Sequence, residues 1–310
     1  MYNVSTKMVN LSVKIGKLKL KNPVLVASGT FGYGEEFKDL VDLEKLGAIV
    51  TKTITLTSHR GNPMPRTIET SCGLLNSIGL QNEGVSDFIK RKIPFLTQLP
   101  TQVVVSIAGE AVKEFKRLTG ILNRQSAVDA IELNISCPNI RNRAGLIAQD
   151  PQATYRVVKA ARKSTQKTLI TKLSPNVTDI VKIAQAAQEA GSYALSLINT
   201  VYAMSIDLNK RKPHLASIFG GLSGPAIKPI ALYMVYKVAQ KIKLPLIGMG
   251  GIMTAQDALE LILAGASAIA VGTANYVNPK VSIEIVQGIK QYLIKHKIRD
   301  IRKLIGTLKI

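Results

Sequence analysis

Short apolar runs rich in β-branched residues recur along the chain, and an amphipathic segment of helical length follows each of them. Continuous apolar strands that alternate with helices are typical of a parallel sheet covered by helices on both faces. The pattern predicts eight strands, at residues 24–28, 48–53, 103–108, 130–136, 168–173, 193–199, 245–250 and 268–273. The predicted helices cover residues 35–47, 84–98, 110–126, 151–164, 176–190, 225–242, 254–264 and 277–296.

The eight strand–helix units follow one another without a linker or a change in composition. They therefore predict an α/β protein built as a single (β/α)8 TIM barrel, one domain over residues 1–310. Ahead of the first strand, the stretches LSVKIG and LKLKN flank a Gly-Lys turn. We interpret them as an N-terminal β-hairpin that closes the bottom of the barrel.

Three connections are much longer than the others, at residues 54–83, 137–150 and 200–224. All three follow the C-terminal end of a predicted strand. Barrel enzymes assemble their sites at that end of the barrel. We therefore expect long loops over the C-terminal face, with the functional site beneath them.

The composition excludes several other classes of protein. The only two cysteines, Cys72 and Cys137, provide no disulfide framework and fit a reducing compartment such as the cytoplasm. The stretch MYNVSTKMVNLSVKIGKLKLKNP lacks the apolar core of a signal peptide. The most apolar segment, residues 258–277, is interrupted by Glu260 and Gly265, which predicts a helix, a turn and a strand instead of a membrane span.

The charge is unusual, because 41 Lys and Arg residues outnumber 20 Asp and Glu residues and leave a net charge of +21. Such a balance is typical of proteins that bind nucleic acid, an anionic substrate or an acidic partner. The basic residues are spread along the chain, Trp is absent, and aromatic residues make up only 5%, so a base-stacking surface is not evident. A lysine-rich surface is therefore favoured over a nucleic-acid-binding face.

Polar residues stand where the predicted strands end, and two of them are lysines. Helix capping explains a single Thr or Asn at such a position. It does not explain Lys52 and Lys172, at the ends of the second and fifth strands. Because both ammonium groups would face the barrel mouth, they favour an anionic ligand.

Two further patterns narrow the class of ligand. The last two strands end in GMGGI (248–252) and AVGTA (270–274), and the loops after these strands form the usual phosphate site of such barrels. They suggest a phosphorylated ligand such as FMN. Paired donors and acceptors at the same mouth would suit a flat, amide-rich heterocycle such as a pyrimidine. The carboxamides that supply them are Asn76, Asn82, Asn134 and Asn199.

Seven ordered motifs resemble those of the dihydroorotate dehydrogenases over nearly the whole chain. They are ASGTFGYGEE, RGNPMPR, LLNSIGLQNEG, LNISCPN, TKLSPNV, SLINT and GGLSGPAIKPIAL. More narrowly, they are similar to the class 1B catalytic subunit, which pairs with an iron–sulfur flavoprotein. The resemblance implies FMN-dependent oxidation of (S)-dihydroorotate to orotate in de novo pyrimidine (UMP) biosynthesis. It also implies a homodimer core that passes electrons to an iron–sulfur FAD subunit, in a heterotetramer, and on to NAD.

The resemblance assigns roles to individual residues. Cys137 would be the catalytic base for the proton at C5 of dihydroorotate, while the flavin takes the hydride from C6, and Lys172 would stabilise the reduced flavin. An inert buried cysteine is the alternative for Cys137, but Pro138 ends the strand directly after it. The residues that match substrate contacts are Lys52, Asn76, Ser77, Ile78, Gly79, Leu80, Asn134, Asn199 and Thr200. Those that match the flavin site are Ser28, Lys52, Thr53, Ser106, Asn134, Lys172, Ile198, Gly224, Gly250, Gly251, Gly272 and Thr273. No metal site is expected.

Departures from the family pattern leave other functions open. Ser106 stands where the family usually has an asparagine that faces the flavin, and Arg143 stands in the cysteine loop where glycines and an aromatic residue are usual. A flavin-binding or interaction protein that has lost catalysis is therefore one alternative. The net charge of +21 would fit a second alternative, a tRNA-dihydrouridine synthase, which is also an FMN barrel with a catalytic cysteine and often basic, but which would need a further RNA-contacting domain.

Overall fold

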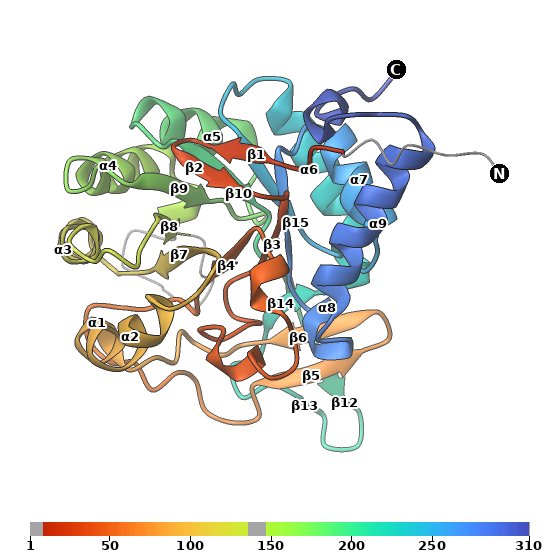
Figure 1. Ribbon diagram of the computed structural model, residues 1–310. Coiled ribbons are helices and arrows are strands. Elements are labelled where there is room, and N and C mark those ends of the chain that lie inside the picture. Colours follow the sequence, from red (N-terminus) through yellow and green to blue (C-terminus); the bar gives the residue numbers. More distant parts are fainter. Residues whose placement is uncertain (1–8, 136–146, 310) are drawn as a thin grey trace.

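Eight parallel strands form a closed barrel in the computed structural model, which describes residues 9–135 and 147–309 (Figure 1). The barrel closes where the last strand pairs with the first, with Ala270 beside Leu25. The strands, in barrel order, are β3 (Val24–Val26), β4 (Ala48–Val50), β7 (Gln102–Ile107), β8 (Ala130–Asn134), β9 (Thr168–Lys172), β10 (Ala194–Leu197), β15 (Leu246–Met249) and β16 (Ala268–Val271). All eight predicted strands and the (β/α)8 fold class are confirmed.

Helices cover the outside of the barrel (Figure 1). They turn apolar residues at three- and four-residue spacing toward the strands, as α3 does with Phe115, Leu118 and Leu122, all of which are buried. The longer helices are α3 (Val112–Asn123), α4 (Pro151–Arg162), α5 (Ile180–Glu189), α6 (Lys228–Ala239), α7 (Ala255–Leu263) and α9 (Val281–Lys295). The shorter ones are α1 (Gly84–Asp87), the π-helix η3 (Phe88–Lys92), α2 (Ile93–Leu96) and α8 (Ala274–Val277), with 3₁₀ turns η4 (Ile147–Gln149), η5 (Pro225–Ile227) and η6 (Ile301–Leu304).

The helix predicted over residues 35–47 is wrong as a continuous element. Two 3₁₀ turns stand there, η1 (Glu35–Phe37) and η2 (Leu43–Lys45). The side chain of Asp42 accepts a hydrogen bond from the N–H of Glu44 and starts a new turn, which competes with continuation of the helix. Phe37 instead turns back and stacks on Phe31, with 3.9 Å between the ring centroids.

The predicted N-terminal hairpin is confirmed. Strands β1 (Val13–Ile15) and β2 (Leu18–Leu20) pair antiparallel around a turn in which Gly16 has a φ of +59°, a conformation that favours glycine. The N–H of Lys17 donates to Oγ1 of Thr168, at the start of β9, over 3.0 Å. The hairpin therefore covers the N-terminal end of the barrel.

A second sheet, which the sequence pattern did not predict, lies over the opposite end of the barrel (Figure 1). It joins the long connections after the second and sixth barrel strands. Its four antiparallel strands, in order, are β11 (Val201–Ala203), β14 (Gly220–Ser223), β6 (Gly73–Asn76) and β5 (Thr67–Thr70). A small hairpin, β12 (Ile206–Asp207) and β13 (Lys212–Pro213), extends beyond it.

Nearly every residue of the barrel strands is buried, and most are Val, Ile, Leu or Ala. A few buried polar residues interrupt this apolar core, among them Ser106, Glu132, Lys172 and Ser196. A buried polar group needs a hydrogen-bond partner to avoid a desolvation cost. These residues therefore mark places where hydrogen bonds, in addition to apolar packing, connect the interior of the barrel. Among the described residues, no helix is both long and apolar enough to span a membrane.

Candidate active site

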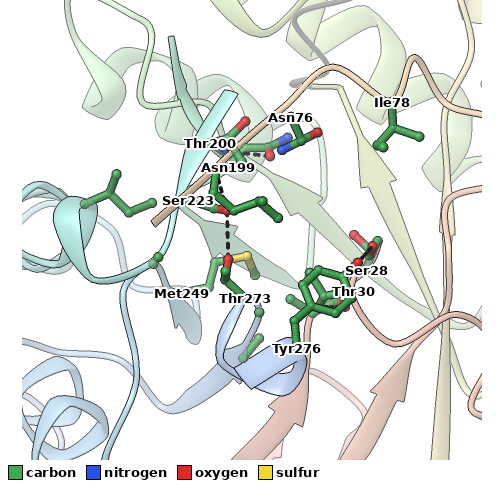
Figure 2. A pocket seen from close by; sticks show the side chains of 18 of the residues that line it. Ser28, Thr30, Asn76, Ile78, Asn199, Thr200, Ser223, Met249, Thr273 and Tyr276 are labelled. Atoms are coloured by element: carbon green, nitrogen blue, oxygen red, sulfur yellow. Dashed lines mark hydrogen bonds between the residues drawn. The ribbon is translucent and has the colours of Figure 1, made fainter. Parts of the chain in front are cut away.

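A cavity of about 510 Å³ lies at the C-terminal ends of the barrel strands, within the size range of small-ligand sites. Its floor is formed by residues at or just after the ends of the strands, such as Ser28 and Lys172. Residues of the second sheet, such as Asn76 and Ser223, form the other side (Figure 2). The cavity is therefore enclosed between the barrel mouth and the long connections.

Lys172 is the last residue of β9 and only 4% exposed. Its Nζ atom donates to Oγ of Ser28 over 3.2 Å. Asn134, the last residue of β8, is its partner in the strand register, and both residues line the cavity. A buried ammonium group beside a cavity is a strong site for negative charge on a ligand.

Lys52 follows β4 and also lines the cavity. Burial lowers the pKa of its ammonium group, and the positive charge of Arg66 lowers that pKa further. Arg66 is a cavity residue too, and its guanidinium donates to the side-chain oxygen of Gln81. The sequence analysis gave Arg66 no role, although it stands at the end of the RGNPMPR motif.

Three of the four predicted carboxamides do meet in the cavity. Nδ2 of Asn199 donates to Oδ1 of Asn134 over 3.5 Å, and Nδ2 of Asn76 donates to the backbone oxygen of Gly221 over 3.2 Å. Asn82 does not line this cavity. Its Oδ1 atom accepts the N–H groups of Thr55 and Gly84, so it shapes the loop instead.

Glycine turns follow the last two barrel strands, as predicted. Gly251 has a φ of +71°, and a Cβ atom there would lie 2.6 Å from Cβ of Lys228, so only glycine fits. A Cβ atom at Gly272 would meet only Cβ of Ala27, at 3.9 Å, which leaves open space beside that backbone. Oγ1 of Thr273 donates to Oγ of Ser223 across this part of the cavity, over 2.7 Å (Figure 2).

Most of the residues predicted for substrate or cofactor line this one cavity. They are Ser28, Lys52, Thr53, Asn76, Ile78, Gly79, Leu80, Asn134, Lys172, Ile198, Asn199, Thr200, Gly224, Gly250, Gly251, Gly272 and Thr273. Ser77 and Ser106 are fully buried and stand behind the wall instead of in it. Cys137 lies outside the described residues.

The structure adds cavity residues that the sequence analysis missed. Tyr276 donates from its hydroxyl to the backbone oxygen of Gly29 over 3.0 Å, and burial raises its pKa. Thr30 and Met249 also line the cavity (Figure 2). Tyr276 belongs to α8, which begins at Ala274, whereas the helix predicted from the sequence began only at residue 277 and left Tyr276 out.

A closed (β/α)8 barrel with lysines, carboxamides and glycine turns gathered at its C-terminal end is the architecture of a TIM-barrel enzyme, which builds its site at that end. The chain belongs to the dihydroorotate dehydrogenase family, whose sequence model matches residues 10–293. Membership of this family implies a flavin cofactor.

Three relatives illustrate the similarity, and each is named dihydroorotate dehydrogenase B (NAD(+)), catalytic subunit. The protein from Trichlorobacter lovleyi is 55% identical over 298 residues, 96% of this chain and 98% of its own. That from Geotalea daltonii is 54% identical over 97% of this chain and 99% of its own. That from a Thermoanaerobacter species is 50% identical over 97% of this chain and 100% of its own.

Proposed function

We propose that this chain is the catalytic subunit of an NAD-linked dihydroorotate dehydrogenase and oxidises dihydroorotate to orotate in pyrimidine biosynthesis. The observation that carries the proposal is the joint placement of Lys52, Lys172 and the carboxamides of Asn134 and Asn199 around one cavity. Two ammonium groups suit an anionic substrate, and the amides suit a ring with alternating carbonyl and N–H groups. The names of the relatives support the same reaction.

The cofactor we propose is FMN, and the residues present fit it. Gly250, Gly251 and Gly272 would hold the phosphate, because their backbones approach the cavity without side chains in between. Lys172 would stand beside the isoalloxazine ring and favour its anionic reduced form. When bound, FMN supplies the acceptor for the hydride that leaves C6 of dihydroorotate.

The chain itself would supply the base. Cys137, proposed for this role, would take the proton from C5 as a thiolate. Asn76, Asn134 and Asn199 would bind and orient the pyrimidine ring. Lys52 would pair with the carboxylate or a carbonyl oxygen of the substrate. The same contact would favour the charged, ammonium form of Lys52.

The electron acceptor requires a partner. Two cysteines are too few to ligate an iron–sulfur cluster, and no GxGxxG motif for a dinucleotide is present. We infer a homodimer core, located in the cytoplasm, with an iron–sulfur FAD subunit on each protomer. The words "catalytic subunit" in the relatives' names support such an assembly.

The experiment is anaerobic mixing of the FMN-loaded chain with dihydroorotate, followed at the flavin absorbance with and without NAD. We expect dihydroorotate to bleach the flavin and NAD to restore it only slowly, until the partner subunit is added. A flavin absorbance that does not change on addition of dihydroorotate would favour a flavin-binding protein that has lost catalysis. Oxidation of a dihydrouridine-containing tRNA, with no response to dihydroorotate, would favour the tRNA-modifying alternative.

A further inference from the structure

A buried carboxylate lies inside the barrel beneath the cavity and has no role in the proposed chemistry. Glu132 belongs to β8, points into the barrel lumen and is only 1% exposed. Its Oε1 atom accepts a hydrogen bond from Oγ of Ser106 over 3.1 Å, and its Oε2 atom accepts one from Oγ of Ser196 over 2.8 Å. The carboxylate therefore links strands β7, β8 and β10 across the lumen.

The contact with Ser106 continues upward to the cavity wall. Oγ of Ser106 lies 3.0 Å from Oγ1 of Thr53. Nδ2 of Asn134 donates to the same Oγ1 atom over 3.2 Å. Both Thr53 and Asn134 line the cavity, whereas Ser106 and Glu132 lie behind it. A connected row of hydrogen bonds thus joins the buried carboxylate to the ligand site.

In its ionised form, Glu132 fixes the direction of every hydrogen bond in this row. A carboxylate only accepts, so the single hydroxyl proton of Ser106 points to Glu132. Toward Thr53, Ser106 is then an acceptor, and the proton of Thr53 points to Ser106. Thr53 consequently offers Asn134 a lone pair and no proton, which requires the amino group of Asn134, not its oxygen, on that side.

The other end of the row demands the same orientation independently. The backbone N–H of Thr200 donates to Oδ1 of Asn199 over 2.8 Å. The amino group of Asn199 therefore faces Asn134 and meets its Oδ1 atom. The backbone donor at one end and the carboxylate acceptor at the other agree on the orientation of both carboxamides.

We propose that Glu132 is a positioning residue that fixes, through Ser106 and Thr53, which atoms of Asn134 and Asn199 face a bound pyrimidine. The inference rests on the proposed function. A reversed carboxamide would present its oxygen to a carbonyl of the ring and its amino group to an N–H. Sites built to pair such groups discriminate strongly against a mismatch, because buried polar groups are then left without partners.

Two serines provide a matched pair of variants for the test. Ser106→Ala and Ser196→Ala each remove one hydroxyl from Glu132, and both positions are 0% exposed. Of these two serines, Ser106 bonds directly to Thr53, whereas Ser196 reaches it only through Glu132 and Ser106. In the FMN-loaded protein, titrated with orotate and followed by the flavin difference spectrum, we expect Ser106→Ala to raise the orotate Kd about tenfold. We expect Ser196→Ala to leave it within about twofold, at a similar loss in Tm.

We call the hydrogen bonds from Glu132 through Ser106 and Thr53 to Asn134 the relay. A double-mutant cycle distinguishes an effect through this relay from a general loosening of the barrel. Thr53→Val keeps the shape of the side chain and removes its hydroxyl. If Ser106 acts through Thr53, adding Ser106→Ala to Thr53→Val leaves the orotate Kd unchanged. Additive effects would overturn the proposal, as would equal Kd changes in Ser106→Ala and Ser196→Ala, or no change in Ser106→Ala.

A second readout does not depend on the pyrimidine. The side-chain ¹⁵N resonance of Asn134, assigned by its loss in Asn134→Asp, should shift in Ser106→Ala and stay in place in Ser196→Ala. If wild-type protein fails to bind orotate while this resonance behaves as expected, the proposed function falls and the relay stands. A resonance that ignores Ser106→Ala would overturn the relay whatever the substrate.

Discussion

The ammonium group of Lys172 lies 3.2 Å from the hydroxyl of Ser28, although their strands, β9 and β3, stand on opposite sides of the barrel. The lysine side chain therefore reaches across the mouth, where it forms part of the cavity floor. A positive charge held in a buried position acts strongly on any group bound above it, because screening by water is weak there.

Replacing this lysine should change the redox properties of the bound flavin. We expect Lys172→Ala to lower the flavin midpoint potential by on the order of 30 mV or more, which corresponds to about 1.4 kcal/mol for a two-electron couple. Ser28→Ala removes the same hydrogen bond and keeps the charge, so its shift should be clearly smaller. Equal potentials in wild type and Lys172→Ala, measured by dye equilibration, would place the lysine away from the ring.

Cys137→Ser should retain FMN and slow its reduction by dihydroorotate about 100-fold or more at neutral pH, because an alcohol replaces a thiolate base. The residual rate should rise with pH. Stopped-flow absorbance under anaerobic conditions gives both results. Cys72 is exposed, and Cys72→Ser is the control that should match wild type. The reverse outcome, a slow Cys72→Ser and a normal Cys137→Ser, would show that the base is misassigned.

The alkaline limit of orotate binding should depend on Arg66. Burial and the charge of Arg66 lower the pKa of Lys52 in the folded protein, so its ammonium group is lost at a lower pH than usual. Arg66→Gln removes the positive charge and should move the alkaline fall in affinity to higher pH, even where it weakens binding at neutral pH. Titrations of orotate across the alkaline range measure this shift. A limit that stays in place would mean that another group controls it.

An ion-pair cluster near the glycine turns should make stability depend on pH. Nζ of Lys228 lies 2.7 Å from Oδ1 of Asp257 and 2.9 Å from Oε2 of Glu260. Although burial raises the pKa of Asp257, hydrogen bonds from Lys228, Met253 and Thr254 lower it overall. Its stabilising contribution is thus present above the ordinary Asp pKa of about 4 and is lost as the pH falls through the lowered value.

Asp257→Asn should therefore lower Tm by a few degrees at pH 7 and by less in acid, as thermal unfolding at several pH values would show. The exposed Glu69 offers a control, because Glu69→Gln should change Tm by no more than about 1 °C at either pH. A Tm difference for Asp257→Asn that grew on acidification would contradict the sign derived from its pKa.

The barrel was predictable because its strands carry local signals. Runs such as AIAVGT are apolar and β-branched along their whole length, which is typical of strands buried on both faces. The second sheet carries no such signal. Strand β5 (TIET) is mostly exposed, and β14 (GGLS) opens with two glycines. Among the described strands, β5 pairs only with β6, its neighbour in the chain, whereas β14 pairs with β6 across a long stretch of sequence that local periodicity cannot bridge.

The same distinction explains which residues of the cavity were predicted from the sequence. Lys172 and Asn134 were identified because a barrel places the ends of all its strands at one mouth. Arg66 and Ser223 come from the long connections, whose path over the mouth is not encoded in local periodicity. Ser106 was assigned to the cofactor on its family position, but its short side chain bonds to Thr53 and Glu132 and stays behind the wall.

The pairing of β6 with β14 has a consequence for how the molecule is made. Asn76 stands beside Gly221 in this pair, so two cavity-forming segments are separated by 145 positions in the chain. Contacts of such long range form slowly, because a large loop must close first. During synthesis on a ribosome, the second sheet, which encloses the cavity, cannot assemble until more than two thirds of the polypeptide has emerged. We therefore expect nascent chains released before that point to have no enclosed ligand site, however much of the barrel they have formed.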